Sequence, residues 1–247
     1  TKCDTEIVLY LYILFKEDCV KWLNGIFAFA VWDEHEKQVY FARDRFGVKP
    51  LFYTQLGSTL LFASEIKALL IHPQVKRVLN QEGLWQLLYM SPTKIEGKSL
   101  FKDIYEVPCA YCGVYKGEAL QLIPYWQLEA KQFLDDEKEA VLTTRDLLKD
   151  AIEKQLVSDV PLATLLSGGL DSSIITSVAA KKYAEEGQVL TTYSFEYEEN
   201  RKYFKRTLFQ PQSDDEFASV LAEILGTHHH ILTASLEELV DLLKEAT

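Results

Sequence analysis

The chain has 247 residues, a formal net charge of -11 and 48% hydrophobic residues, enough for one large domain or two ordinary ones with a sizeable core. The negative charge argues against a nucleic-acid partner, because such surfaces need Lys and Arg to neutralise phosphates. The apolar run at residues 7–15 is too short to span a bilayer and lacks a signal-peptide cleavage pattern. We therefore expect no membrane partner and a cytoplasmic protein, with its four cysteines reduced.

The first half of the chain alternates short apolar runs with polar turns. Such runs predict antiparallel strands, at residues 25–32, 38–42, 51–54 and 60–63. Helical patterns occur at residues 5–15, 65–70 and 81–89. Antiparallel strands with these helices place the first half in the α+β class.

The second half begins beyond an acidic stretch at residues 133–139 and has a different pattern. Helix and strand signals alternate there, at residues 144–156, 162–166, 174–183 and 188–195. The first of these helices places Leu147, Leu148, Ala151 and Ile152 on one face. Alternation of this kind is typical of a parallel α/β sheet. We expect two domains, residues 1–127 and 128–247.

The sequence SGGLDSS at residues 167–173 lies between a predicted strand and a predicted helix. Two glycines let backbone N–H groups close around an anion, and the helix N-terminus adds donors and a favourable dipole. The spacing matches neither the Walker nor the Rossmann pattern. The alternative is a Gly-Gly turn with an Asp or Ser helix cap. All seven residues in this context favour a phosphate cradle.

SGGLDSS resembles the pyrophosphate loop of the ATP pyrophosphatase superfamily, whose members cleave ATP to AMP and pyrophosphate. The resemblance implies that Ser167, Gly168, Gly169, Asp171 and Ser172 surround the departing pyrophosphate. Asp171 can also hold Mg²⁺, which would neutralise the charge that builds on the leaving group. ATP and Mg²⁺ are therefore the expected cofactors.

The first half carries a second set of motifs: NGIFAFAVWD at residues 24–33, FARDRFGVKPLFY at 41–53 and FASEIKAL at 62–69. They resemble the later part of a class II glutamine amidotransferase domain. Joined to SGGLDSS, they resemble the glutamine-dependent asparagine synthetases. The fold implied is an antiparallel αββα Ntn-type sandwich followed by a parallel α/β ATP-pyrophosphatase domain, both incomplete.

This resemblance implies two linked reactions: hydrolysis of glutamine to ammonia, and activation of aspartate by ATP as β-aspartyl-AMP, which ammonia attacks. It places Leu165 and the strand that contains Tyr197 at the adenine and ribose site. Asp4 matches the residue that binds the ammonium of glutamine, although an Asp before a helix can also be an N-cap. The family resemblance also implies a homodimer for a full-length protein.

The ends of the chain depart from the family pattern. The family's glutaminase nucleophile is an N-terminal cysteine, whereas this chain begins with Thr1 and has Cys3 two positions later. We therefore expect no catalytic nucleophile here and an internal piece of a longer synthetase, inactive alone. Two alternatives stay open: a related enzyme that amidates another carboxylate or forms a β-lactam, and a non-enzymatic nucleotide-binding module.

Other residues suggest chemistry less specifically. Cys109 and Cys112 have zinc or redox spacing, but a second ligand pair is not evident and a strand is expected there. Three consecutive histidines, residues 228–230, cannot all ligate one ion from a regular strand. Arg43 and Arg45 are expected to form ion pairs at a domain interface, and residues 203–211 a solvated loop.

Overall fold

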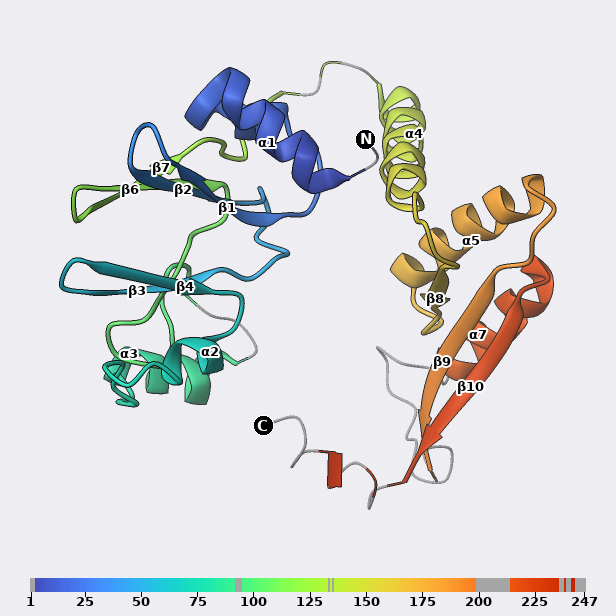
Figure 1. Cartoon of the computed structure of the whole chain (residues 1–247). Helices are drawn as coiled ribbons and strands as arrows, with labels where there is room; N and C mark the ends of the chain where they lie inside the picture. The colour runs from blue at the N-terminus through green and yellow to red at the C-terminus, as the bar shows by residue number, and fades with distance from the viewer. Residues whose placement is uncertain are drawn as a thin grey trace. The chain divides into compact units, whose positions relative to one another are not determined.

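The chain is described by a computed structural model that covers residues 3–91, 95–132, 134, 136–198, 214–235, 238 and 241–242. The chain divides into two compact units, Thr1–Lys131 and Gln132–Thr247, called unit 1 and unit 2 below (Figure 1). The segment at residues 203–211 lies outside the described residues. Within the described ranges, no helix is long and apolar enough to cross a membrane.

Unit 1 contains two antiparallel sheets. The first has the strand order β1(Ala28–Asp33), β2(Gln38–Arg43), β6(Tyr111–Lys116), β7(Ala119–Pro124). The second has the order β4(Thr59–Ala63), β3(Phe52–Leu56), β5(Tyr105–Glu106). The antiparallel pairing predicted for this half is confirmed.

Helices flank the two sheets of unit 1. They are α1(Asp4–Phe15), the 3-10 helix η1(Lys16–Trp22), α2(Ile66–Leu70), α3(Gln81–Trp85) and the π-helical turn η2(Gln86–Met90). The predicted helix at residues 81–89 thus changes its winding after Trp85.

The layers of unit 1 follow from the alternation of side chains along β2. Tyr40 and Ala42 pack toward α1, in a core that includes Tyr12. Phe41 points to the opposite face and packs with Leu51, which directly precedes β3 of the second sheet. The outer face of the second sheet packs against α2. The order helix, sheet, sheet, helix can be followed downward in Figure 1 from α1 to α2 and α3.

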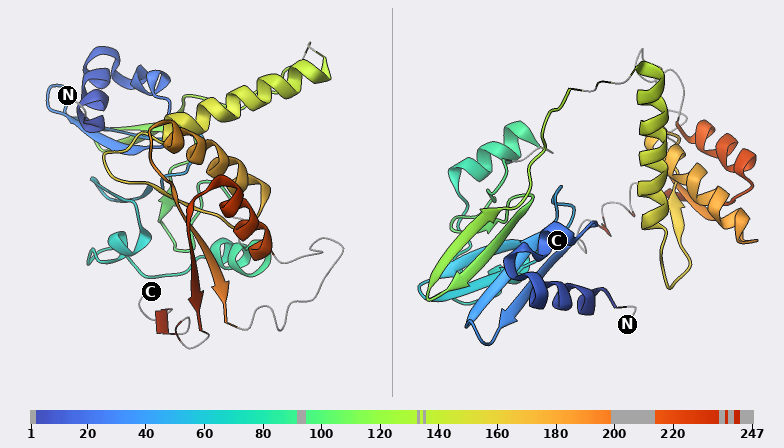
Figure 2. Two further views of the ribbon diagram at one scale, coloured as in Figure 1. Left: turned by 90° about the vertical axis from the view of Figure 1, so that its right-hand side faces the viewer. Right: turned by 90° about the horizontal axis from the view of Figure 1, so that it is seen from above.

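Unit 2 is a parallel sheet with helices. Its elements are α4(Glu137–Gln155), β8(Ala163–Leu165), α5(Leu170–Glu185), β9(Thr191–Tyr197), α7(Asp214–Leu225) and β10(His228–Ala234). The strand order is β10, β9, β8, with all pairs parallel, as the alternation of helix and strand predicted (Figure 2).

One face of this sheet is covered by α5 and α7. Buried Leu166 packs against Ala218 and Ala222 of α7, and the hydroxyls of Thr164 and Thr176 join β8 to α5 at 3.0 Å. Side chains of the opposite face are about half exposed or more: Leu165, Phe195, Tyr197 and Leu232.

The apolar face of α4 is not buried. Leu147 is 64% exposed, and none of the described residues of α4 is buried. The helix also begins earlier than predicted, at Glu137, because Asp136 accepts the backbone N–H of Glu139 at 2.9 Å and caps it. Periodicity thus identified the helix, while its environment depended on which elements pack against it.

Candidate functional site

The loop with the sequence SGGLDSS joins the carboxyl end of β8 to the N-terminus of α5. Leu166, fully buried, donates its backbone N–H to the carbonyl oxygen of Tyr193 on β9 at 2.7 Å and continues the strand pairing by one residue. Ser167 to Gly169 then form the loop, and α5 begins at Leu170. The predicted strand, loop and helix are therefore confirmed. In open parallel sheets, the carboxyl ends of strands are where ligands bind.

The two serine hydroxyls hold the loop closed. Ser172 Oγ donates to the carbonyl oxygen of Gly169 at 3.2 Å, so it must accept from Ser167 Oγ, 3.0 Å away. Ser172 Oγ also accepts the backbone N–H of Ser167 at 3.2 Å. Gly168 has φ +87°, a conformation that glycine adopts without strain. The predicted loop residues Ser167, Gly169 and Ser172 are thus in contact with one another.

Asp171 lies in the first turn of α5 and is exposed. Its negative charge is favourable at the positive end of the helix dipole. Together with the hydroxyls of Ser167 and Ser172 it supplies oxygen donors, the type that Mg²⁺ prefers. The described residues contain no group of three or more His, Cys, Asp or Glu side chains that could hold a metal ion by themselves.

The predicted adenine-site residues lie on the face of the sheet opposite α5 and α7. Leu165 is 79% exposed and pairs in register with Tyr193. Tyr197 is 52% exposed and packs edge-to-face with Phe195, at 5.1 Å between ring centroids. Tyr197 lies four residues beyond Tyr193, the partner of Leu165, which corresponds to about 13 Å at about 3.3 Å per strand residue. Leu165 and Tyr197 therefore lie on the same face of the sheet but at different positions along the strands.

Asp4 in unit 1 lines a groove of about 730 Å³. The groove is lined by β1, an edge strand of its sheet, by residues of α1 and by Lys49, Pro50 and Ser64. The expected alternative for Asp4, an N-cap, is wrong: Cys3 holds the cap position, and Asp4 is the first helical residue. Its carboxylate is exposed at the groove.

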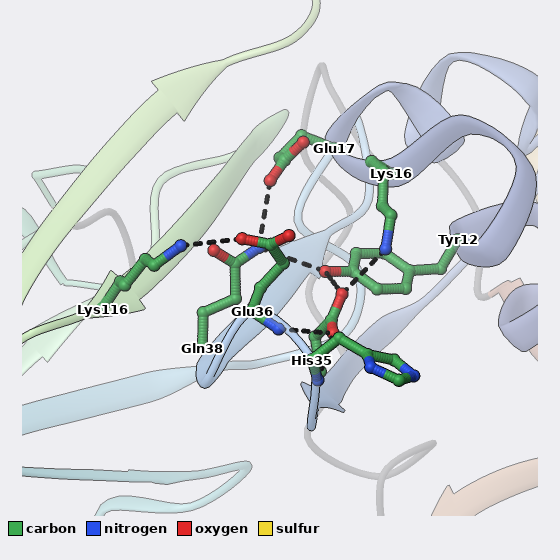
Figure 3. A network of polar contacts seen from close by, with 8 residues as sticks. Tyr12, Lys16, Glu17, His35, Glu36, Gln38 and Lys116 are labelled. Carbon is green, nitrogen blue, oxygen red and sulfur yellow. Dashed lines mark hydrogen bonds and ion pairs between the residues drawn. The ribbon is translucent and has the colours of Figure 1, made fainter.

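A polar network ties the C-terminal end of α1 to the hairpin of β1 and β2 (Figure 3). Asp33 Oδ2 accepts from Tyr12 Oη at 3.1 Å and from Lys16 Nζ at 2.9 Å. Gln38 Nε2 donates to Tyr12 Oη and to Glu17 Oε1. Hydrogen bonds from Lys16 first, and also from the backbone of Glu36 and from Tyr12, lower the pKa of Asp33. The network fixes the helix that carries Asp4.

The expected ion pairs of the Arg43 region prove to be internal to unit 1. Arg43 is buried; its Nη2 lies 2.8 Å from Glu106 Oε1, and its N–H groups donate to the carbonyl oxygens of Gly47, Lys49 and Val107. Arg45 donates to the carbonyl oxygen of Leu23. These arginines therefore organise the loop between β2 and β3.

The cysteine pair is divided between different environments. Cys112 belongs to the core between α1 and the first sheet, and burial raises the pKa of its thiol. Cys109 precedes β6, and its Sγ lies beside Gly47. Burial raises the pKa of the Cys109 thiol as well. Both shifts disfavour the thiolate form that metal binding and redox chemistry use.

The three histidines occupy β10, where their side chains alternate as expected for a strand. His230 stacks on Tyr193, at 5.2 Å between ring centroids. His229 points to the other face and bonds to the hydroxyls of Thr192 and Ser194. This contact was missed by sequence reasoning. Its one signal is that Thr192 and Ser194 alternate with aromatic residues in β9.

Comparisons with known proteins match both units. A family model described as a glutamine amidotransferase domain matches residues 1–126, and a model described as asparagine synthase matches residues 143–247. The chain is 47% identical over 244 residues to the glutamine-hydrolysing asparagine synthetase 3 of Bacillus subtilis (strain 168). That alignment covers 98% of this chain and 40% of the relative.

Two further relatives are more distant. The glutamine-hydrolysing asparagine synthetase 1 of Bacillus subtilis is 32% identical over 98% of this chain and 36% of its own length. The amidase chyE of Penicillium rubens is also 32% identical, over 98% of this chain and 36% of its own length. The chain thus spans well under half of each relative. Since the glutamine amidotransferase model covers residues 1–126, just over half of the chain, the chain belongs to the glutamine amidotransferase domain family, and its second unit matches the asparagine synthase model.

Proposed function

We propose that the protein of which this sequence is part makes asparagine from aspartate, ATP and ammonia released from glutamine. The observation that carries the proposal is the loop from Ser167 to Ser172, closed by its own hydroxyls at the N-terminus of a 16-residue helix and at the carboxyl end of a parallel sheet. The domain division at residues 1–127 and 128–247, and an Ntn-type sandwich for unit 1, belong to the same proposal.

In the synthetase reaction, an oxygen of the aspartate β-carboxylate attacks the α-phosphorus of ATP. The bond from that phosphorus to the bridging oxygen breaks, and pyrophosphate leaves. Ammonia then attacks the β-carbonyl carbon, loses a proton, and expels AMP to give the amide. Charge grows on the pyrophosphate as it leaves, so fixed donors at that place lower the barrier.

The loop residues would hold the pyrophosphate. The backbone N–H of Gly168 and those of the first turn of α5 would supply donors, while the hydroxyls of Ser167 and Ser172 use their protons within the loop and hold its shape. Asp171 would hold Mg²⁺, which neutralises phosphate charge when bound. Leu165 and Tyr197 would border the adenine and ribose, on the exposed face of the sheet.

In unit 1, Asp4 would bind the ammonium group of glutamine at the groove beside β1. Asp4 is exposed at the groove, and Lys49, which also lines it, carries a positive charge of the kind that a substrate carboxylate would need. A free amino acid carries both charges, so a groove with one carboxylate and one ammonium is complementary to it.

Titration of the protein with Mg-ATP in a calorimeter tests the nucleotide site. Asp171→Asn is expected to weaken Mg-ATP binding about tenfold and to remove its dependence on Mg²⁺, because one charge-assisted contact of roughly 1.4 kcal/mol is lost. The control is Glu185→Gln, which removes an exposed charge at the other end of α5 and should leave binding unchanged. Equal affinities for wild type and Asp171→Asn would contradict the assignment.

A second candidate is amidation of a different carboxylate, and the similarity to a Penicillium rubens protein named as an amidase, rather than as an asparagine synthetase, is the observation that keeps it open. The amidase and the asparagine synthetase 1 of Bacillus subtilis have the same sequence identity to this chain and the same coverage. A panel of amino-acid and carboxylic-acid acceptors, with AMP release measured at fixed Mg-ATP and ammonia, separates the two. Aspartate-dependent AMP formation supports asparagine synthesis, whereas AMP formation with another acceptor supports the second candidate. Binding of ATP without AMP formation from any acceptor would favour a nucleotide-binding module.

A further inference from the structure

His229 on β10 bridges two hydroxyl side chains of the neighbouring strand β9. Its Nδ1 lies 2.9 Å from Thr192 Oγ1, and its Nε2 lies 2.9 Å from Ser194 Oγ. His229 pairs in register with Thr192, so the imidazole reaches both the residue opposite and the next residue on the same face. Thr192 and Ser194 are both buried, where each hydroxyl requires a partner.

The directions of these hydrogen bonds follow from counting protons. Thr227 Oγ1 donates to the carbonyl oxygen of Ala222, so it accepts from Thr192 Oγ1, 3.0 Å away. Thr192 has then used its only proton and must accept from His229 Nδ1–H. The unprotonated Nε2 accepts from Ser194. Burial first, and the neighbouring His230 second, lower the pKa of His229, which agrees with a neutral ring.

The two residues that His229 holds flank Tyr193. The carbonyl oxygen of Tyr193 accepts the backbone N–H of Leu166 at 2.7 Å, and Leu166 directly precedes Ser167. β8 pairs with β9 only from Thr191 to Tyr193. Leu166 is therefore the point at which the chain leaves the sheet and enters the loop. The backbone that His229 immobilises is therefore the backbone to which the loop is anchored.

We propose that His229 is a positioning residue of the nucleotide site: it acts through Thr192 and Ser194 to fix Tyr193, and through Tyr193 to fix Leu166 and the start of the pyrophosphate loop. The inference rests on the proposed function, because it assigns a role toward a nucleotide. A slip of β10 by one residue would move the imidazole to the other face, so the clamp also specifies the strand register.

The test compares His229→Phe and Ser194→Ala with His228→Phe. His228 lies next to His229 on β10, is exposed and points to the opposite face, so it serves as the matched control. Ser194→Ala removes only the hydroxyl bonded to Nε2 and is the milder change. We expect Mg-ATP affinity to fall about tenfold in His229→Phe. The double variant His229→Phe with Ser194→Ala should lose no more affinity than His229→Phe alone, because both changes break the same path. His228→Phe should stay within about twofold.

Two spectroscopic measurements separate positioning from simple stabilisation. In ¹⁵N spectra of the imidazole, the wild-type protein should show protonated Nδ1 and unprotonated Nε2, and Ser194→Ala should shift the Nε2 resonance. Amide hydrogen exchange should accelerate at residues 166–169 in both variants, while exchange at residues 179–180 in the middle of α5 stays as in wild type.

The outcomes are distinguishable from those of the nucleotide-binding test. Wild-type protein that fails to bind Mg-ATP would overturn the proposed function, and with it the role of His229 toward a nucleotide. Wild-type binding combined with unchanged exchange at residues 166–169 in Ser194→Ala and His229→Phe would overturn the positioning role alone. Faster exchange across all of α5 would also overturn it, because that pattern indicates a general loss of stability.

Discussion

Gly113 on β6 shows how a single residue sets the spacing between the layers of unit 1. It pairs in register with Phe41, and a Cβ atom placed on Gly113 would lie 2.3 Å from Cζ of the Phe41 ring. Phe41 is fully buried between the two sheets. Only a residue without a side chain leaves room for this ring.

Replacement of Gly113 by Ala should therefore destabilise the protein. We expect Gly113→Ala to lower the free energy of unfolding by about 1–3 kcal/mol, the usual cost of an overpacked core. Gly25→Ala is the control, since no atom lies within 4 Å of its added Cβ. Urea unfolding followed by far-UV circular dichroism measures both; equal midpoints for the two variants would show that Phe41 can move aside.

Arg43 is a second single residue with a large structural role. Its buried guanidinium joins the end of β2 to the following loop and to β5. Arg43→Lys keeps the charge but cannot reach all the carbonyl oxygens of Gly47, Lys49 and Val107. We expect a loss of about 1–3 kcal/mol in the free energy of unfolding, since buried acceptors lose their donors. Lys116→Gln, which breaks an exposed pair with Glu36, should change stability little. Similar losses in the two variants would contradict the assignment.

At the scale of elements, the attachment of α1 to the hairpin of β1 and β2 depends on a charged carboxylate. The pKa of Asp33 is lowered from its ordinary value of 3.8 by its hydrogen bond from Lys16 and by the other bonds described above. The unfolded chain therefore takes up a proton at a higher pH than the folded chain does. Stability from this group is present above pH 3.8 and is lost as the pH falls toward the lower folded-state pKa.

The stability of the wild-type protein should therefore decline more steeply between pH 5 and pH 3 than that of Asp33→Asn, whose side chain does not titrate in this range. Urea midpoints at the two pH values give the slopes. The variant is expected to be less stable than wild type at pH 5, because the contact between the amide and Lys16 is no longer an ion pair. Parallel slopes would show that Asp33 titrates normally in the folded protein.

At the scale of the whole molecule, the sheet of unit 2 has one covered face and one exposed apolar face. Phe195 and Leu232 pair in register on β9 and β10, and each is about half exposed. Large exposed apolar surfaces bind apolar dyes and other apolar surfaces. The double variant Phe195→Ser and Leu232→Ser should lower the fluorescence of bound anilinonaphthalene sulfonate at least about twofold. Ile224→Ser, exposed on α7, is the control and should lower it less.

The environment of each element could be predicted only in part. The strands of unit 1 and the strand, loop and helix around SGGLDSS agree with their sequence patterns, because glycines, caps and apolar periodicity act over a few residues. The apolar face of α4 is not buried, since periodicity indicates an apolar stripe without indicating what packs against it. The ion pairs of Arg43 were assigned to a domain interface and lie inside unit 1.

The sequence by itself determined the family, the phosphate-cradle motif and the class of each unit, because these depend on residue types at short and regular spacings. The tertiary structure decided which distant residues meet. It joined Tyr12 to Asp33, Arg43 to Glu106, and His229 to Thr192 and Ser194, pairs that lie 21 to 63 positions apart. Such contacts arise from strand register and helix packing, which are collective properties of the folded chain.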